Sequence, residues 1–200
     1  MQNEVPVIPN TPFAGGFYAG RIRIDDINYA IIVAPKAEGE HDDIAWNRSV
    51  KNVAGALSYC DGLTNTNAMV EAGSRVAKWA RDLRIGGFDD WYLPSQDELE
   101  VCYRNLKPGT DENALWGRSG INVSAVPPTY PYTAEVPKQT ESEDFRKGGA
   151  QAFEPEWYWT STQHAGDAGY AWVQNVGDGG QSNGRKGNYY RARAVRRLKI

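Results

Sequence analysis

The sequence has 200 residues, enough for one domain with a sizeable hydrophobic core and at most a small appendage. Its formal net charge is −3 and it has no lysine-rich run, so it lacks the basic footprint of nucleic-acid-binding proteins and no nucleic-acid partner is expected. No positively charged start leads into an apolar segment, and no apolar run approaches the ~20 residues that span a bilayer. We therefore expect a soluble chain with no signal peptide and no membrane insertion.

The N-terminal stretch contains prolines and shows little periodicity. Pro6, Pro9 and Pro12 predict an extended arm over residues 1–16. Such an arm either packs on a neighbouring subunit or frays as a terminus. The rest of the chain, residues 17–200, is expected to form a single domain.

The first half of this domain changes from strand-like to helix-like patterning. Strand formers over Phe17–Ile24 and Tyr29–Ala34, joined by turn residues, predict a hairpin, and a polar loop follows over Lys36–Asp43. Apolar residues at helical spacing then predict two helices, over Ser49–Cys60 and Asn67–Leu83.

The stretch after Pro94 gives the most specific helix signal. Ser95 and Glu98 have the spacing of a capping box, in which each residue satisfies a backbone N–H of the other. An apolar stripe at helical spacing follows, made of Leu99, Cys102, Tyr103 and Leu106. The pattern predicts a helix that begins at this cap.

A long segment, Pro108–Pro155, has no helical or strand period. It carries several glycines and serines, a charged patch over Glu141–Lys147, and four further prolines: Pro127, Pro128, Pro131 and Pro137. We interpret it as an irregular insertion, which in a single domain is usually either functional or disordered.

The C-terminal fifth has the composition of a binding surface. Three strands are predicted, Trp157–Thr162, Tyr170–Val176 and Asn188–Leu198, with a glycine-rich polar loop over Gly177–Gly187 before the last. Aromatic residues offer contact area at low entropic cost, and small polar residues adapt to a ligand. The alternative is a core meander with ordinary turns.

Alternation along the second of these strands places Tyr170, Trp172 and Gln174 on one face. For Trp172 a core position is the alternative, and Trp91, Trp157 and Trp159 are assigned to the core. The expected ligand contacts are Tyr170, Trp172, Gln174, Gln181, Asn183, Arg185, Asn188, Tyr189 and Arg191.

No catalytic or metal-binding constellation is recognisable. His41 and His164 lack metal-ligand neighbours at useful spacing, and the glycines around Asp178 lack the repeated carboxylates of a calcium site. Cys60 and Cys102 fall on apolar helix faces and are expected to be free, buried and inert. We therefore expect no catalytic residue, no metal and no cofactor.

Several segments together resemble one known family, the C-terminal domain of Lcl-type collagen-like proteins. They are AGALSYCDGL, GGFDDWYLPSQDELEVCY, WYWTST, YAWVQNVGDGG and RARAVRR, in this order. The most specific feature pairs the D-W-x-L-P stretch of Asp90–Pro94 with the W-x-x-T/S-T stretch that begins at Trp157. The family occurs in bacterial surface proteins and phage virion proteins.

The resemblance implies a C-type-lectin-like fold of the α+β class, with helices packed on a twisted antiparallel sheet and here a long irregular insertion. It also implies that the last strands and loops carry the ligand surface. The related formylglycine-generating enzymes use a reactive cysteine pair near the C-terminus, and this chain has no cysteine after Cys102. Calcium-ligating lectin motifs are not recognisable, so any ligand is expected to bind without metal.

These observations favour a non-enzymatic receptor-binding or adhesion module at a phage tail fibre or tail tip, made in the host cytoplasm and carried on the virion. Its partners would be a bacterial surface receptor, either glycan or protein, and other virion proteins. A structural virion protein, such as a head decoration or baseplate protein, is the alternative, and a lectin-fold enzyme is a third. We also expect a homo-oligomer, with a trimer as the most plausible form.

Overall fold

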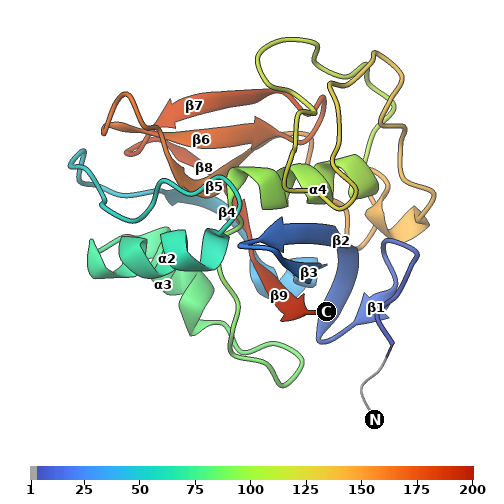
Figure 1. Cartoon of the computed structure of the whole chain (residues 1–200), viewed down its shortest axis with the longest axis horizontal. Coiled ribbons are helices and arrows are strands. Elements are labelled where there is room, and N and C mark those ends of the chain that lie inside the picture. Colours follow the sequence, from blue (N-terminus) through green and yellow to red (C-terminus); the bar gives the residue numbers. More distant parts are fainter. Residues whose placement is uncertain (1–3) are drawn as a thin grey trace.

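The computed structural model describes residues 4–200 as helices and two β-sheets joined by long loops, a mixed α+β architecture (Figure 1). The first sheet has the strand order β1 (Pro12–Phe13), β2 (Gly16–Ile24), β3 (Ile27–Val33) and β9 (Val195–Lys199). The second sheet has the order β4 (Glu40–Ala45), β8 (Tyr189–Arg193), β5 (Trp157–Gln163), β6 (Tyr170–Asn175) and β7 (Gln181–Arg185). The predicted fold class of helices with sheet is confirmed at this level.

The predicted first hairpin is confirmed as β2 and β3. Its tight turn contains Asp25 and Asp26, both with positive φ, a conformation that aspartate tolerates better than most residues. The arm before it lies against the same chain, because the Asn10 amide donates to the Tyr18 carbonyl and the Tyr18 amide donates to Thr11. Residues 1–3 of the predicted arm lie outside the described residues.

The C-terminal strands differ from the prediction in three ways. The loop predicted over Gly177–Gly187 contains a strand, β7, and the strand predicted over Asn188–Leu198 is two strands in different sheets. The chain crosses between the sheets at Ala194, whose backbone bonds Gly39 and Ala34. The pairing of β5 with β8 is parallel, so the second sheet is mixed and not purely antiparallel.

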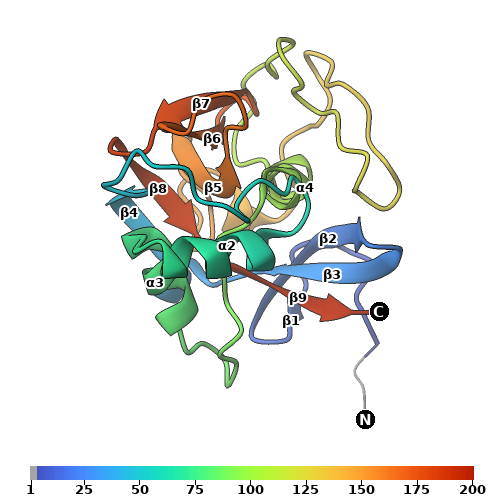
Figure 2. The ribbon, with the colours of Figure 1, turned by 60° about the vertical axis from the view of Figure 1, so that its left-hand side comes forward.

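The helix predicted from the capping box is confirmed as α4 (Gln96–Leu106). The Glu98 amide donates to Ser95 Oγ, and the Ser95 amide donates to Glu98 Oε2 at 2.7 Å. Burial raises the pKa of the Glu98 carboxyl to about 7. Every residue of the first two turns of α4 is buried, because the helix lies between the two sheets and contacts both β2 and β6 (Figures 1 and 2).

The predicted helix over Ser49–Cys60 is wrong, because this segment is a loop held by side chains of other elements. The Gln163 Oε1 atom accepts from the Val53 amide, and the Gln163 amide donates to the Ala56 carbonyl. These bonds compete successfully with helix formation. We call residues 50–61 the 50s loop.

The predicted helix over Asn67–Leu83 is two helices, α2 (Gly62–Glu71) and α3 (Arg75–Asp82). Gly73, at a φ of 78°, ends the first, and Ser74 caps the second. The segment predicted as a polar loop over Lys36–Asp43 contains the short helix α1 (Lys36–Gly39) and the start of β4.

The insertion, residues 108–155, is irregular as predicted, with only one short 3-10 helix, η1 (Glu143–Phe145). It is packed onto the domain, since Phe145 is fully buried and Ser124 and Val126 exchange backbone hydrogen bonds with the free edge of β2. The core assignment is confirmed for Trp91 and Trp159, which are fully buried, whereas Trp157 is only partly buried.

Candidate functional site

Six of the nine expected contact residues form three cross-strand pairs on one face of β6 and β7. The pairs are Tyr170 with Arg185, Trp172 with Asn183, and Gln174 with Gln181. Exposure falls along this series, from the exposed Arg185 and Asn183 to the buried glutamines. The outer two pairs therefore lie at the surface, and the inner pair lies beneath α4 and the insertion.

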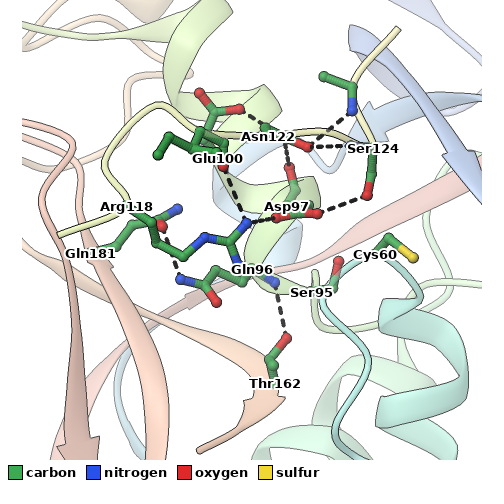
Figure 3. Close-up of polar contacts among 12 residues, drawn as sticks. Cys60, Ser95, Gln96, Asp97, Glu100, Arg118, Asn122, Ser124, Thr162 and Gln181 are labelled. Carbon is green, nitrogen blue, oxygen red and sulfur yellow. Dashed lines mark hydrogen bonds and ion pairs between the residues drawn. The ribbon is translucent and has the colours of Figure 1, made fainter. Parts of the chain in front are cut away.

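The inner pair fastens α4 to the sheet. Gln174 has no exposed surface and Gln181 is 3% exposed. Gln96, in the first turn of α4, donates from Nε2 to Gln181 Oε1 at 2.8 Å, and its amide donates to Thr162 Oγ1 (Figure 3). In this conformation neither Gln174 nor Gln181 reaches a ligand outside the domain, contrary to the role that the sequence suggested.

A row of neighbouring side chains from four separate segments borders the outer pairs, with ring planes tilted by 55° between Tyr59 and Trp172 and by 38° between Trp172 and His164. The Arg118 guanidinium carbon lies 4.6 Å from the Tyr59 ring centre, the Tyr59 and Trp172 ring centres are 6.3 Å apart, and those of Trp172 and His164 are 5.6 Å apart. All four side chains are half-buried. We call Arg118, Tyr59, Trp172 and His164 the stacked row; it joins the insertion, the 50s loop, β6 and the end of β5.

Asp97 of α4 positions the first two members of the stacked row. Its Oδ1 accepts from Arg118 Nη2 at 3.1 Å and its Oδ2 accepts from Ser124 Oγ at 2.8 Å (Figure 3). Its amide donates to the Tyr59 carbonyl. Burial raises the pKa of the Asp97 carboxyl to about 6, although the bonds from Ser124 and Arg118 oppose the shift. Asp97 thus holds the insertion through its carboxylate and the 50s loop through its backbone amide.

A second buried carboxylate, Glu100, ties more of the insertion to α4. Its oxygens accept from Asn122 Nδ2 at 2.8 Å and from the Tyr132 hydroxyl at 3.1 Å, and it pairs with Arg104 at 2.9 Å. Figure 3 shows Asn122 between the Glu100 carboxylate and the Asp97 backbone carbonyl, and its Nδ2 donates to both. The irregular insertion has a fixed position because polar side chains of α4 form hydrogen bonds with its backbone and side chains.

We call the region where α4, the 50s loop and the insertion meet β6 and the end of β5 the junction, and several of its buried polar atoms lack a hydrogen-bond partner among residues 4–200. Six buried side-chain nitrogen or oxygen atoms lack a partner among the described residues, and Trp91 Nε1 is the one that lies in another part of the core. A buried polar group without a partner costs about 1–3 kcal/mol, and buried groups of this kind are commonly bonded by ordered internal water. The five at the junction are Gln96 Oε1, Ser119 Oγ, His164 Nδ1, Trp172 Nε1 and Gln174 Oε1.

The remaining expected contacts are separate from the stacked row, on and just before β8. Tyr189 is 55% exposed, and Asn188 Nδ2 donates to the Tyr190 hydroxyl. Arg191 forms ion pairs with Asp42 at 2.6 Å, Glu156 at 2.9 Å and Glu40 at 3.3 Å. These carboxylates outweigh burial and raise the pKa of the Arg191 guanidinium, which is thereby occupied within the chain.

The two cysteines are free thiols, as expected from the sequence. Burial raises the pKa of the Cys102 thiol strongly and that of the half-buried Cys60 thiol to a smaller extent, so neither favours the nucleophilic thiolate. Over residues 4–200, no group of three or more His, Cys, Asp or Glu side chains is placed to hold a metal ion. Over the same residues, no helix is long and apolar enough to cross a bilayer.

A profile of the family described as the Lcl C-terminal domain matches residues 38–196. The chain belongs to the Lcl C-terminal domain family. The matched part runs from α1 into β9 and contains every member of the stacked row, whereas β1, β2 and β3 precede it. None of the curated proteins compared with the chain is similar enough to count as a match.

Most members of the junction were missed by sequence reasoning, namely Tyr59, Gln96, Asp97 and Arg118, and His164 was not among the expected ligand contacts. The first four lie in three separate segments, the 50s loop, α4 and the insertion, and only the fold brings these together. One signal was available: α4 carries three acidic residues, Asp97, Glu98 and Glu100, within its first turns, more than a cap requires.

Proposed function

We propose that this chain is a non-enzymatic binding module of a phage particle, carried at a tail fibre or tail tip, that holds a bacterial surface molecule. We further propose that the two sheets and α4 form a variant of the C-type-lectin-like fold, with the ligand surface on β6, β7 and the neighbouring loops. Membership of the Lcl C-terminal domain family is compatible with both proposals.

The stacked row is the observation that carries the proposal. Aromatic and arginine side chains that are already ordered lose little entropy when a partner binds, and such residues dominate binding energy at interfaces. Trp172 and Tyr59 are half-exposed, and Asn183 and Arg185 flank them with exposed polar groups. This combination of rigid rings and adaptable polar groups is typical of a recognition surface.

The position of this surface suits display. In Figures 1 and 2, β6, β7 and the insertion lie at the upper side of the domain, while β1 and β9 lie below α4. A domain attached through its N-terminal side would therefore present the stacked row away from the attachment. Exposed Val7 (82%) and Ile8 (68%) on the arm offer an apolar contact for a neighbouring subunit, which supports the proposed homo-oligomer.

Alanine substitutions at the surface test the receptor role. Asn183→Ala and Arg185→Ala remove exposed polar groups beside the stacked row, and at a central contact each should weaken binding of the purified protein to host cells by about 2 kcal/mol or more. Lys78→Ala, at a side chain 71% exposed on α3, is the matched control and should bind as the parent does. Parent-like cell binding by both surface variants, together with Tyr189→Ala, would place the receptor surface elsewhere.

A structural role in the virion is the second candidate, favoured by the insertion. Four large apolar side chains there are strongly exposed, which is typical of surfaces that contact other proteins: Leu115 (68%), Trp116 (49%), Val123 (73%) and Tyr130 (78%). Labelling particles with antibody against the chain separates the two roles. Signal on the head would favour a decoration protein over a receptor-binding tail protein.

A further inference from the structure

We propose that the first part of the 50s loop is a strap that opens readily, because its closed position buries the ammonium of Lys186 without a carboxylate to neutralise it. Opening of the strap is a property of the free protein and does not depend on the proposed function. It is a conformational device built from the loop and from two side chains outside it.

Two buried side chains hold the strap closed. Gln163 Oε1 accepts from the Val53 amide at 2.8 Å. Lys186 Nζ donates to the same oxygen at 2.6 Å and to the Lys51 carbonyl at 3.0 Å. Lys186 therefore holds the strap both directly and through Gln163.

The surroundings of the Lys186 ammonium are neutral. Lys186 has no exposed surface, and its Nζ lies 4.5 Å from the centre of the Trp46 ring. None of the ion pairs formed within residues 4–200 includes Lys186. A buried charge that is surrounded by neutral groups retains much of its desolvation cost, so the closed strap is less stable than its hydrogen bonds suggest.

Charged or titratable side chains on the neighbouring segments do not remove this cost. One of them is a carboxylate, Asp167 in the turn between β5 and β6, and its Oδ1 accepts from the Gly169 amide. The others are cationic or can become so. The full set is Arg48 and Lys51 near the start of the 50s loop, His164 at the end of β5, Asp167, and Arg185 next to Lys186.

Protonation of Lys186 therefore favours the open strap. Burial lowers the pKa of the Lys186 ammonium from 10.5 to about 8 in the closed strap. In an open strap the side chain returns to water, and its pKa returns to 10.5. Because the open state binds the proton more tightly, raising the pH from 7.5 to 9.5 should reduce the open population by about 20-fold.

The movement is limited to the first part of the loop. Val53 and Ala56 are buried in the core cluster that contains Trp46, and the two residues between them are exposed. Further along, the Ser58 carbonyl accepts from Asn65 Nδ2 and from a side chain of β5. Opening therefore lifts residues 51–56 and leaves the end of the loop attached to α2 and β5.

Trypsin cleavage after Lys51 measures the opening, because a protease needs an extended segment and the Lys51 carbonyl is bonded in the closed strap. Cleavage at pH 7.5 and 9.5 is followed by mass spectrometry and normalised to an unstructured lysine peptide in the same reaction. When closing is faster than cleavage, the rate follows the open population. The normalised rate in the parent should therefore fall by about 20-fold between the two pH values.

The decisive variant is Lys186→Met, which keeps the length of the side chain and removes the charge. Its strap should be cleaved more slowly than that of the parent at pH 7.5, since no charge is buried on closing, and the normalised rate should not change with pH. Lys78→Met, at a side chain 71% exposed on α3, is the matched control and should show the same pH dependence as the parent.

A titration of the parent protein tests the same idea without any variant. In NMR spectra of the protein labelled with ¹³C-lysine, the Lys186 signal should titrate near pH 8, below the ordinary value of 10.5. Titration of Lys186 at the ordinary value, a normalised cleavage rate in the parent that is equal at both pH values, or the parent's pH dependence in Lys186→Met would each overturn the inference.

Discussion

The buried Asp97 carboxyl should make the stability of the chain depend on pH in a direction opposite to that of most salt-bridged acids. Its pKa is about 6 in the folded protein, above the usual value of 3.8, because burial disfavours the charged form. Between these two pH values the folded state binds more protons at this site than the unfolded state does. The unfolding free energy from this group is therefore largest below pH 4 and falls as the pH rises through 6.

The difference between 3.8 and about 6 corresponds to about 3 kcal/mol. Asp97→Asn preserves the size of the side chain and removes the titration. The unfolding free energy of the parent should therefore fall by about 2 kcal/mol more than that of Asp97→Asn between pH 4 and 7.5, because part of the difference is already lost at pH 4. Other titrating groups, including Glu98, are common to both proteins and cancel in this comparison.

Urea unfolding followed by tryptophan fluorescence at a series of pH values measures this difference directly. Asp82→Asn, at a side chain 62% exposed on α3, is the matched control and should remain within about 0.5 kcal/mol of the parent at each pH. Equal pH dependence in the parent and in Asp97→Asn would show that the carboxyl is solvated, and would refute its assignment as the buried clamp of the insertion.

Three further changes test other parts of the structure. Gly179→Ala should lower the unfolding free energy by about 2 kcal/mol or more, because the φ of Gly179 is +78° and a Cβ there would overlap the Tyr103 ring. A Cβ at Gly187 meets no atom within 4 Å, so Gly187→Ala is the control and should be nearly neutral in thermal unfolding. Ser95→Ala should cost about 1 kcal/mol through loss of the α4 cap, measured by denaturant unfolding. Replacing Cys60 and Cys102 together by Ala should lower the unfolding free energy by about 1–3 kcal/mol and leave binding to host cells intact. An enzymatic activity that the parent has and the folded double variant has lost would instead support an enzyme.

The sequence predicted those elements whose signals are local. The capping box of Ser95 and Glu98, the aspartate turn before β3 and the aromatic runs of β5 and β6 each specify structure within about ten residues. The 50s loop was mistaken for a helix because its apolar spacing fits a helix. Its backbone is satisfied instead by Gln163, a residue more than a hundred positions away in the sequence.

The candidate site was predicted only in part, again because only local signals can be interpreted from the sequence. Strand alternation identified the face of β6 that bears Trp172, but alternation cannot tell the exposed end of a face from the end that another helix covers. Gln174 and Gln181 are buried because α4 lies over them, and α4 is far away in sequence. The stacking of Arg118 on Tyr59 depends on the path of an irregular insertion, for which no periodic signal exists.

The pairing of β3 with β9 has a consequence for the order of events during synthesis. Val33 and Val195 are partners in the first sheet, so the β2–β3 hairpin emerges from the ribosome long before the strand that covers its edge. Until residues 195–199 arrive, β3 presents an open edge of apolar residues that can pair with another chain. A nascent or truncated chain that stops short of β9 is therefore expected to aggregate through β3, even though the stacked row and α4 are already complete in its sequence.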